Sequence, residues 1–118
     1  ALQPHVPMLF ETHPRLNMAF VEPALLPLLQ TYKSKQAEAA QKQSAAAELW
    51  RRWCARFAIT GTPSEPADHD GAIDALVCAT AAACLHRAPQ SMCLLPHDAN
   101  ACTGGGPFIV FEPAGSKK

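Results

Sequence analysis

Hydrophobic and polar residues recur with helical spacing in two long segments of the chain. Residues 35–57 are strong helix formers without Gly or Pro, and their larger apolar side chains fall on one helix face. That face comprises Leu49, Trp50, Trp53, Cys54 and Phe57. Residues 70–87 have the same periodicity, with a core-facing stripe of Ile73, Leu76, Val77, Thr80, Ala81, Cys84 and Leu85. The pattern therefore predicts two main helices, over residues 35–57 and 70–87.

Two short apolar runs predict β-strands, over residues 8–12 and 108–111, and a proline follows each run closely. Because both predicted helices lie between them, the strands are expected to pair in parallel within an α/β layer. A sheet of two short strands is too small to be stable alone. We therefore expect a partial layer whose sheet is completed by strands upstream of the chain or by a second copy in a homodimer.

Proline and glycine divide the rest of the chain. Residues 15–29 contain Pro23 and Pro27, which predict short helical turns instead of one helix. Residues 88–107 contain three prolines and a run of three glycines, and this composition predicts a loop. A length of 118 residues predicts that 1–118 is a single domain or the carboxyl-terminal part of one longer domain.

Charge and cysteine content limit the possible partners and compartment. Ten basic residues balance ten acidic residues, so a polyanion would have to be held by a local patch. The five cysteines are odd in number and include no C-x-x-C, which predicts reduced thiols in a cytoplasmic protein. No apolar run approaches the length of a membrane span, so we expect no membrane partner.

Three carboxylates are the candidate chemical groups. Asp70 and Asp74 are four residues apart, so on a helix they share a face and could bridge a divalent cation. The alternative is an N-cap followed by a first-turn acid, which is common at helix starts. Glu11 ends the first predicted strand, where it points to solvent or stands at a ligand site on the carboxyl end of the sheet.

A zinc site is a further alternative from the residues alone. Its ligands would be His86, Cys93, His97 and Cys102, whose spacing is looser than that of structural zinc motifs. Isolated cysteines and histidines, buried or on the surface, are the simpler interpretation of these residues.

Three motifs carry a resemblance to a known family. They are Phe10-Glu11-Thr12-His13-Pro14-Arg15, then His69-Asp70 with Asp74-Ala75-Leu76-Val77-Cys78-Ala79, and finally Gly106-Pro107 with the strand that follows. The pair Tyr32-Lys33 lies between the first two. In this order the motifs resemble a family of uncharacterised prokaryotic proteins described as predicted nucleases of the ribonuclease H-like superfamily. The resemblance extends over about residues 9–113 and corresponds to the carboxyl-terminal half of such a nuclease.

The resemblance implies metal-dependent hydrolysis of phosphodiester bonds in nucleic acid, either RNA or DNA. Glu11, Asp70 and Asp74 would be the catalytic carboxylates and would hold Mg²⁺ or Mn²⁺, hard cations that prefer oxygen ligands. The family also has an Asp on its first strand, but no acidic residue precedes Glu11 here. We therefore expect this part of the protein to be inactive without its upstream portion.

The competing hypothesis is a non-catalytic interaction module. An open sheet edge favours pairing with another chain. On this hypothesis the chain self-associates through its sheet edge, with Trp50, Trp53 and Phe57 as exposed contacts.

Overall fold

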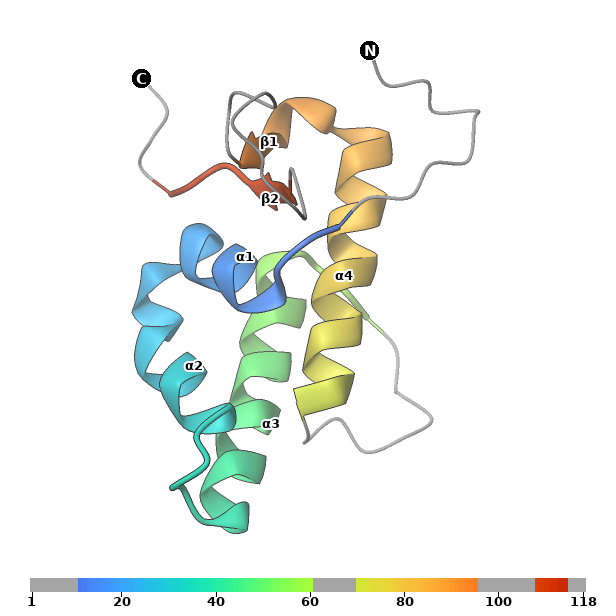
Figure 1. The fold of residues 1–118 in the computed structure, drawn as a ribbon. Helices are drawn as coiled ribbons and strands as arrows, with labels where there is room; N and C mark the ends of the chain where they lie inside the picture. Colours follow the sequence, from blue (N-terminus) through green and yellow to red (C-terminus); the bar gives the residue numbers. More distant parts are fainter. Residues whose placement is uncertain (1–10, 61–69, 96–107, 115–118) are drawn as a thin grey trace.

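The structure is a computed structural model that describes residues 11–60, 70–95 and 108–114, apart from the side chains of Asp70, Leu95 and Phe108. In these described residues, four α-helices and a two-stranded sheet make a mixed helix and strand fold (Figure 1). The helices are α1 (Pro14–Val21), α2 (Leu26–Tyr32), α3 (Ala39–Arg56) and α4 (Asp70–Arg87), and the strands are β1 (Met92–Leu95) and β2 (Phe108–Phe111). Single 3-10 turns, Pro23–Leu25 and Pro89–Ser91, precede α2 and β1.

Helices α3 and α4 confirm the two predicted helices. Helix α4 has the predicted bounds, whereas α3 begins four residues later than expected. The delay has a local cause, because Ser34 Oγ accepts hydrogen bonds from the backbone of residues 36 and 37 and holds a turn there. The capping box between Glu38 and Gln41 then starts the helix.

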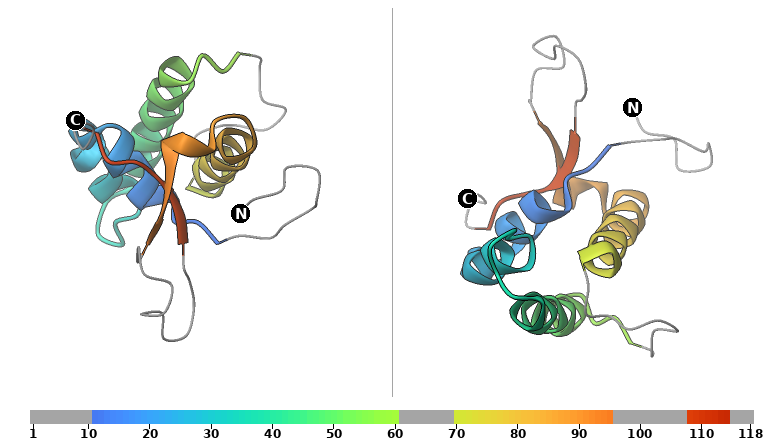
Figure 2. Two further views of the ribbon diagram at one scale, coloured as in Figure 1. Left: turned by 90° about the horizontal axis from the view of Figure 1, so that it is seen from above. Right: turned by 60° about the horizontal axis from the view of Figure 1, so that its bottom comes forward.

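Prolines shape the segment before α3, as predicted for residues 15–29. Pro14 opens α1, and Pro23 opens the 3-10 turn. Pro27 lies in the first turn of α2, where its missing N–H is tolerated. The result is two short helices at an angle to each other, with α2 packed on α3 (Figures 1 and 2).

The core lies where the four helices meet. Helix α3 buries Ala45, Leu49 and Trp53, which follow one another at intervals of four residues along one face. Helix α4 buries Ile73 and Val77 with the same spacing. The rings of Trp53, Phe57 and Phe111 pack together and join the end of α3 to β2, with centroid distances of 4.6–5.9 Å. Trp53 is only 1% exposed, so its predicted role as a surface contact is wrong.

One buried hydrogen bond fixes the middle of α4 against α3. The indole Nε1–H of Trp53 donates to Thr80 Oγ1 at 3.0 Å, and that hydroxyl donates to the Leu76 carbonyl at 2.8 Å. Both polar groups are therefore satisfied inside the core, which avoids the cost of an unpaired buried donor.

None of the described helices is long and apolar enough to cross a membrane.

The two described strands, β1 and β2, pair antiparallel at one end of the helices (Figure 2), so the pairing seen for β2 is not the parallel one that was expected. Strand β2 confirms the prediction for residues 108–111, but β1 lies within the segment predicted to be a loop, so that prediction is wrong for Met92–Leu95. Pro89 and Pro96 flank this four-residue apolar run, which made the segment resemble a loop. Of the strand predicted over 8–12, residues 8–10 lie outside the described residues. Its Glu11 carbonyl accepts a hydrogen bond from Ile109 N–H at 2.9 Å.

The side of β2 that faces away from β1 is closed by side chains and by the segment before α1. Thr12 Oγ1 donates to the Ile109 carbonyl, and Asn17 Oδ1 accepts from Phe111 N–H at 2.9 Å. The Asn17 Nδ2 group donates in turn to Thr12 Oγ1 at 2.7 Å. Asn17 is fully buried, so this side chain satisfies the strand edge where water has no access.

Replacing Asn17 by alanine is expected to lower the free energy of unfolding by about 2 kcal/mol or more, because Phe111 N–H and Thr12 lose a partner inside the core. Urea unfolding followed by tryptophan fluorescence measures this change. Gln43→Ala removes an amide from the exposed face of α3 and should stay within about 0.5 kcal/mol of the parent chain. Equal stability of the two variants would contradict the role of Asn17.

Candidate functional site

Three polar side chains from two distant segments meet at the first turns of α4. Tyr32 Oη donates a hydrogen bond to Asp74 Oδ1 at 3.1 Å, and Lys33 Nζ donates to Asp74 Oδ2 at 2.6 Å. We refer to Tyr32, Lys33 and Asp74 as the Asp74 cluster. Its members come from positions 41 and 42 residues apart in the sequence. Both oxygens of one carboxylate are therefore held by the end of α2.

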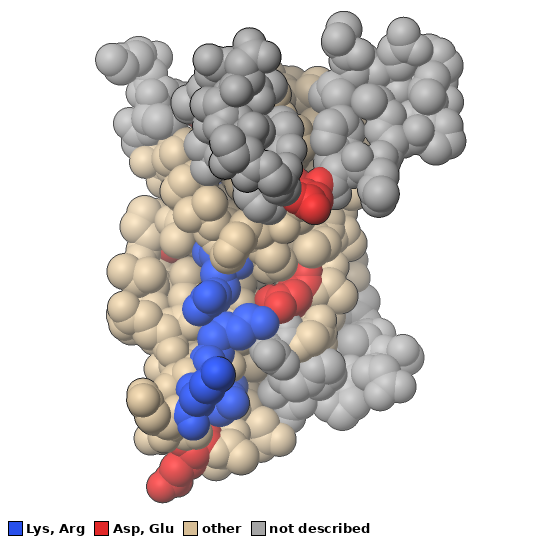
Figure 3. Space-filling view, in the orientation of Figure 1, with Lys and Arg blue, Asp and Glu red and all other residues tan. Residues whose placement is uncertain are grey.

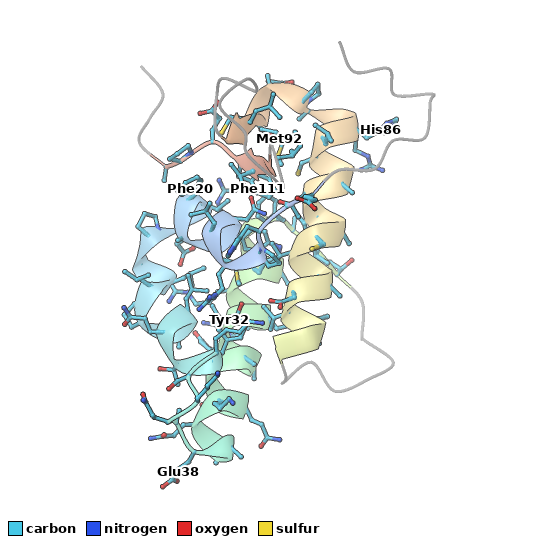
Figure 4. All side chains as sticks on the ribbon, viewed as in Figure 1. Phe20, Tyr32, Glu38, His86, Met92 and Phe111 are labelled. Carbon is cyan, nitrogen blue, oxygen red and sulfur yellow. The ribbon has the colours of Figure 1, made fainter. Side chains whose placement is uncertain are left out.

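Packing explains why these side chains meet. Tyr32 is the last residue of α2, and its ring is buried in the core with 1% of its surface exposed (Figure 4). A buried tyrosine hydroxyl requires a partner, and Asp74 supplies it. Lys33 follows directly, and its ammonium group lies 5.4 Å from the centre of the Tyr32 ring, within the range of a cation–π contact.

The carboxylate of Asp74 is supported from inside the molecule and open on the outside. The side chains of Lys33 and Asp74 are 28% and 31% exposed, so solvent reaches the ion pair. An ion pair that is this exposed contributes at most about 1 kcal/mol to stability. The cluster thus holds a carboxylate in a defined position while leaving it accessible to a solute.

Cys78 stands one turn after Asp74 on α4. Partial burial raises the pKa of its thiol, and the negative charge of Asp74 raises it further. Burial also raises the pKa of Cys54, Cys84 and Cys93. A thiol with a raised pKa is a poor nucleophile at neutral pH, so these four cysteines lack the activation that a catalytic cysteine requires.

The three carboxylates predicted to form the site have different surroundings. Asp74 belongs to the cluster, whereas Glu11 has an exposed side chain and a carbonyl bonded to β2. Asp70 is the first residue of α4, and its side chain lies outside the described residues. Among the side chains that the structure describes, no group of three His, Cys, Asp or Glu residues could hold a metal ion. The meeting of all three carboxylates stays a prediction.

The proposed zinc ligands cannot be placed together either. His86 is exposed on the last turn of α4, and Cys93 lies half-buried on β1. His97 and Cys102 lie outside the described residues. The zinc site therefore stays a prediction, without support from the part of the chain that the structure describes.

The chemistry of Asp74 suits one hydrated divalent ion. An ionised carboxylate offers about four lone-pair positions, and Tyr32 and Lys33 occupy one on each oxygen. Mg²⁺ keeps most of its waters and is often bound through one or two carboxylates together with substrate phosphates. Asp74 could therefore supply one ligand to a hydrated Mg²⁺ or Mn²⁺ ion, against the positive charge of Lys33, and a two-ion site would need further carboxylates such as Asp70.

The pairing of Tyr32 and Lys33 with Asp74 was not predicted from residue patterns. Tyr32-Lys33 was noted only as part of the family resemblance, and no periodicity in the sequence connects it to α4. Of the three arginines of α3, Arg51 and Arg56 are exposed, whereas Arg52 is half-buried. Arg51 pairs with Glu48 on the same helix, and Arg52 pairs with Glu22 at the end of α1.

Replacing Asp74 by asparagine is expected to speed the alkylation of Cys78 by iodoacetamide. Loss of the negative charge lowers the pKa of the thiol, so at a given pH more thiolate is present and the rate profile moves to lower pH. Peptide mapping by mass spectrometry over a pH series reports each cysteine separately. Glu112→Gln is the matched control, because Glu112 raises the pKa of Cys93 instead. An unchanged Cys78 profile in the Asp74 variant contradicts this electrostatic picture.

Comparisons with known proteins identified no relative of this chain. No protein-family model, curated protein or solved structure matches the chain. The Asp74 cluster and the sequence motifs are therefore the basis for proposing a function.

Proposed function

We propose that the chain is the carboxyl-terminal part of a metal-dependent nuclease that hydrolyses phosphodiester bonds in RNA or DNA. One observation carries the proposal. Tyr32, Lys33 and Asp74 all belong to the sequence segments that resemble ribonuclease H-like nucleases, and they meet in space although about forty residues separate them. Asp74 is the central ligand of the proposed site, and Glu11 and Asp70 are its proposed further carboxylates.

The members of the cluster have complementary roles in such a site. Tyr32 is buried and holds one carboxylate oxygen, so it fixes the direction of Asp74. Lys33 places a positive charge beside the carboxylate, where it can also pair with a phosphate oxygen of the substrate. A Mg²⁺ or Mn²⁺ ion bound there would act as a Lewis acid on the phosphate and lower the pKa of bound water.

The distribution of charge supports a nucleic-acid partner. The chain has no net charge, yet lysine and arginine side chains gather in a band on the face shown in Figure 3. Acidic groups lie beside this band and at its end. A local basic strip is what a protein without net charge needs to hold a phosphate backbone.

A specific observation also favours the second candidate, self-association through a sheet edge. In β2, Ile109 and Phe111 direct their N–H groups away from β1, towards Glu11 and Asn17. Leu94 is the residue opposite Ile109 in this antiparallel pair. Its main-chain N–H and C=O groups therefore point away from β2, towards the outer edge of β1. Leu94 is also 37% exposed, so the outer edge of β1 can accept a strand from a second copy.

The nuclease proposal is tested by Mn²⁺ binding, measured through the electron paramagnetic resonance signal of free Mn²⁺. Asp74→Asn is expected to weaken binding at least ten-fold, because even outer partners of metal ligands account for about 10–100-fold in affinity. Glu48→Gln is the matched control, since Glu48 is also a half-exposed carboxylate paired with a cation. Equal Mn²⁺ affinity of the Asp74 variant and the parent chain would refute the proposal.

Self-association is tested by multi-angle light scattering over a series of chain concentrations. If β1 edges pair, the parent chain is expected to form dimers and Leu94→Lys to remain monomeric, because a charge on the edge blocks strand addition. Leu26→Lys provides the control, as Leu26 is an exposed leucine on α2, away from the sheet. A monomeric parent chain excludes this candidate.

A further inference from the structure

Lys33 lies where it would compete with a bound cation for the carboxylate of Asp74. The Lys33 ammonium group lies 2.6 Å from Oδ2, while Tyr32 holds Oδ1 at 3.1 Å. A cation that approaches Asp74 therefore meets a positive charge that is already in place. At this separation two like charges repel strongly, even at the effective dielectric of a protein surface.

Lys33 is able to leave the carboxylate, whereas Tyr32 is not. Lys33 follows the last residue of α2, its side chain is 28% exposed, and its long flexible stem can reach an alternative partner. Tyr32 is 1% exposed and packs in the core cluster, so its hydroxyl stays beside Asp74. The ion pair with Asp74 is half-exposed, and pairs of this kind contribute little to stability.

We propose that Lys33 moves between Asp74 and an incoming phosphate group, so that binding of a phosphodiester and binding of a divalent cation at Asp74 strengthen each other. This inference rests on the proposed function, because it assumes that the cation binds at Asp74. When a phosphodiester draws the ammonium group away, the repulsion on the cation falls and the carboxylate regains a free oxygen. Linkage requires the reverse effect, so the bound cation also frees Lys33 for the phosphate.

Through this exchange, the ion pair controls when a metal ion binds at Asp74. Without a phosphodiester, Lys33 neutralises Asp74 and disfavours a metal ion there. When a phosphodiester is bound, Lys33 neutralises the phosphate instead of the Asp74 carboxylate. The cation is then bound mainly when substrate is present, which makes the site selective for the complete assembly of carboxylate, cation and phosphodiester.

The experiment measures Mn²⁺ affinity by paramagnetic resonance, with and without dimethyl phosphate as the phosphodiester probe. Lys33→Met is expected to bind Mn²⁺ about five-fold or more tightly than the parent chain, at the lower end of typical coupling between sites. Dimethyl phosphate should raise the Mn²⁺ affinity of the parent chain and leave that of Lys33→Met unchanged. Lys33→Gln should behave in the same way as Lys33→Met.

Lys35→Met is the matched control, because it removes the same charge from an exposed position two residues away. It should bind Mn²⁺ as the parent chain does and keep the response to dimethyl phosphate. If Asp74→Asn abolishes Mn²⁺ binding but Lys33→Met binds no more tightly than the parent chain, the exchange is refuted and the nuclease proposal survives. If Asp74→Asn leaves Mn²⁺ binding unchanged, both fail.

Discussion

The amide of Asn17 joins helix α1 to strand β2 through a buried hydrogen bond. It lies in α1 with no exposed surface, accepts from Phe111 N–H and donates to Thr12 Oγ1. A strand edge buried without such partners would lose the free energy of its main-chain hydrogen bonds. Because this side chain meets the requirement, β2 can lie against α1 in the core, and α1 in turn sets the point from which α2 departs.

The position of α4 depends on two aromatic side chains that each carry one polar atom. Trp53 donates to Thr80 in the middle of the helix, and Tyr32 donates to Asp74 near its beginning. Both rings are buried, so their polar atoms need partners and hold α4 in one register along α3 and α2. The second of these contacts is also what positions the candidate site, since it orients a carboxylate whose other side is open to solvent.

Charge pairing distinguishes the candidate site from the rest of the surface. Arg51 pairs with Glu48 on the exposed face of α3, and Arg52 makes a half-buried pair with Glu22 at the end of α1. The pair of Lys33 with Asp74 differs because a buried tyrosine supports the same carboxylate. A fixed carboxylate next to a displaceable cation is the feature on which both the nuclease proposal and the exchange of Lys33 depend.

The candidate site was only partly predictable. Spacing singled out Asp74 as a helix carboxylate, and the family resemblance drew attention to Tyr32-Lys33, but neither indicated that they touch. Contacts over such separations depend on how α2, α3 and α4 pack, which no local pattern encodes. The roles of Glu11 and Asp70 as ligands remain predictions.

Local periodicity in the sequence was enough to determine α4 with its bounds, the body of α3 and the strand β2, because helix and strand patterns repeat over a few residues. Only the tertiary structure decided that Met92–Leu95 is a strand, since a four-residue apolar run becomes one when a partner such as β2 supplies its hydrogen bonds. It also decided that Trp53 is core and not surface, and that the end of α2 holds Asp74. Burial and long-range hydrogen bonds are properties of the packed chain, and they exist only once the helices have met.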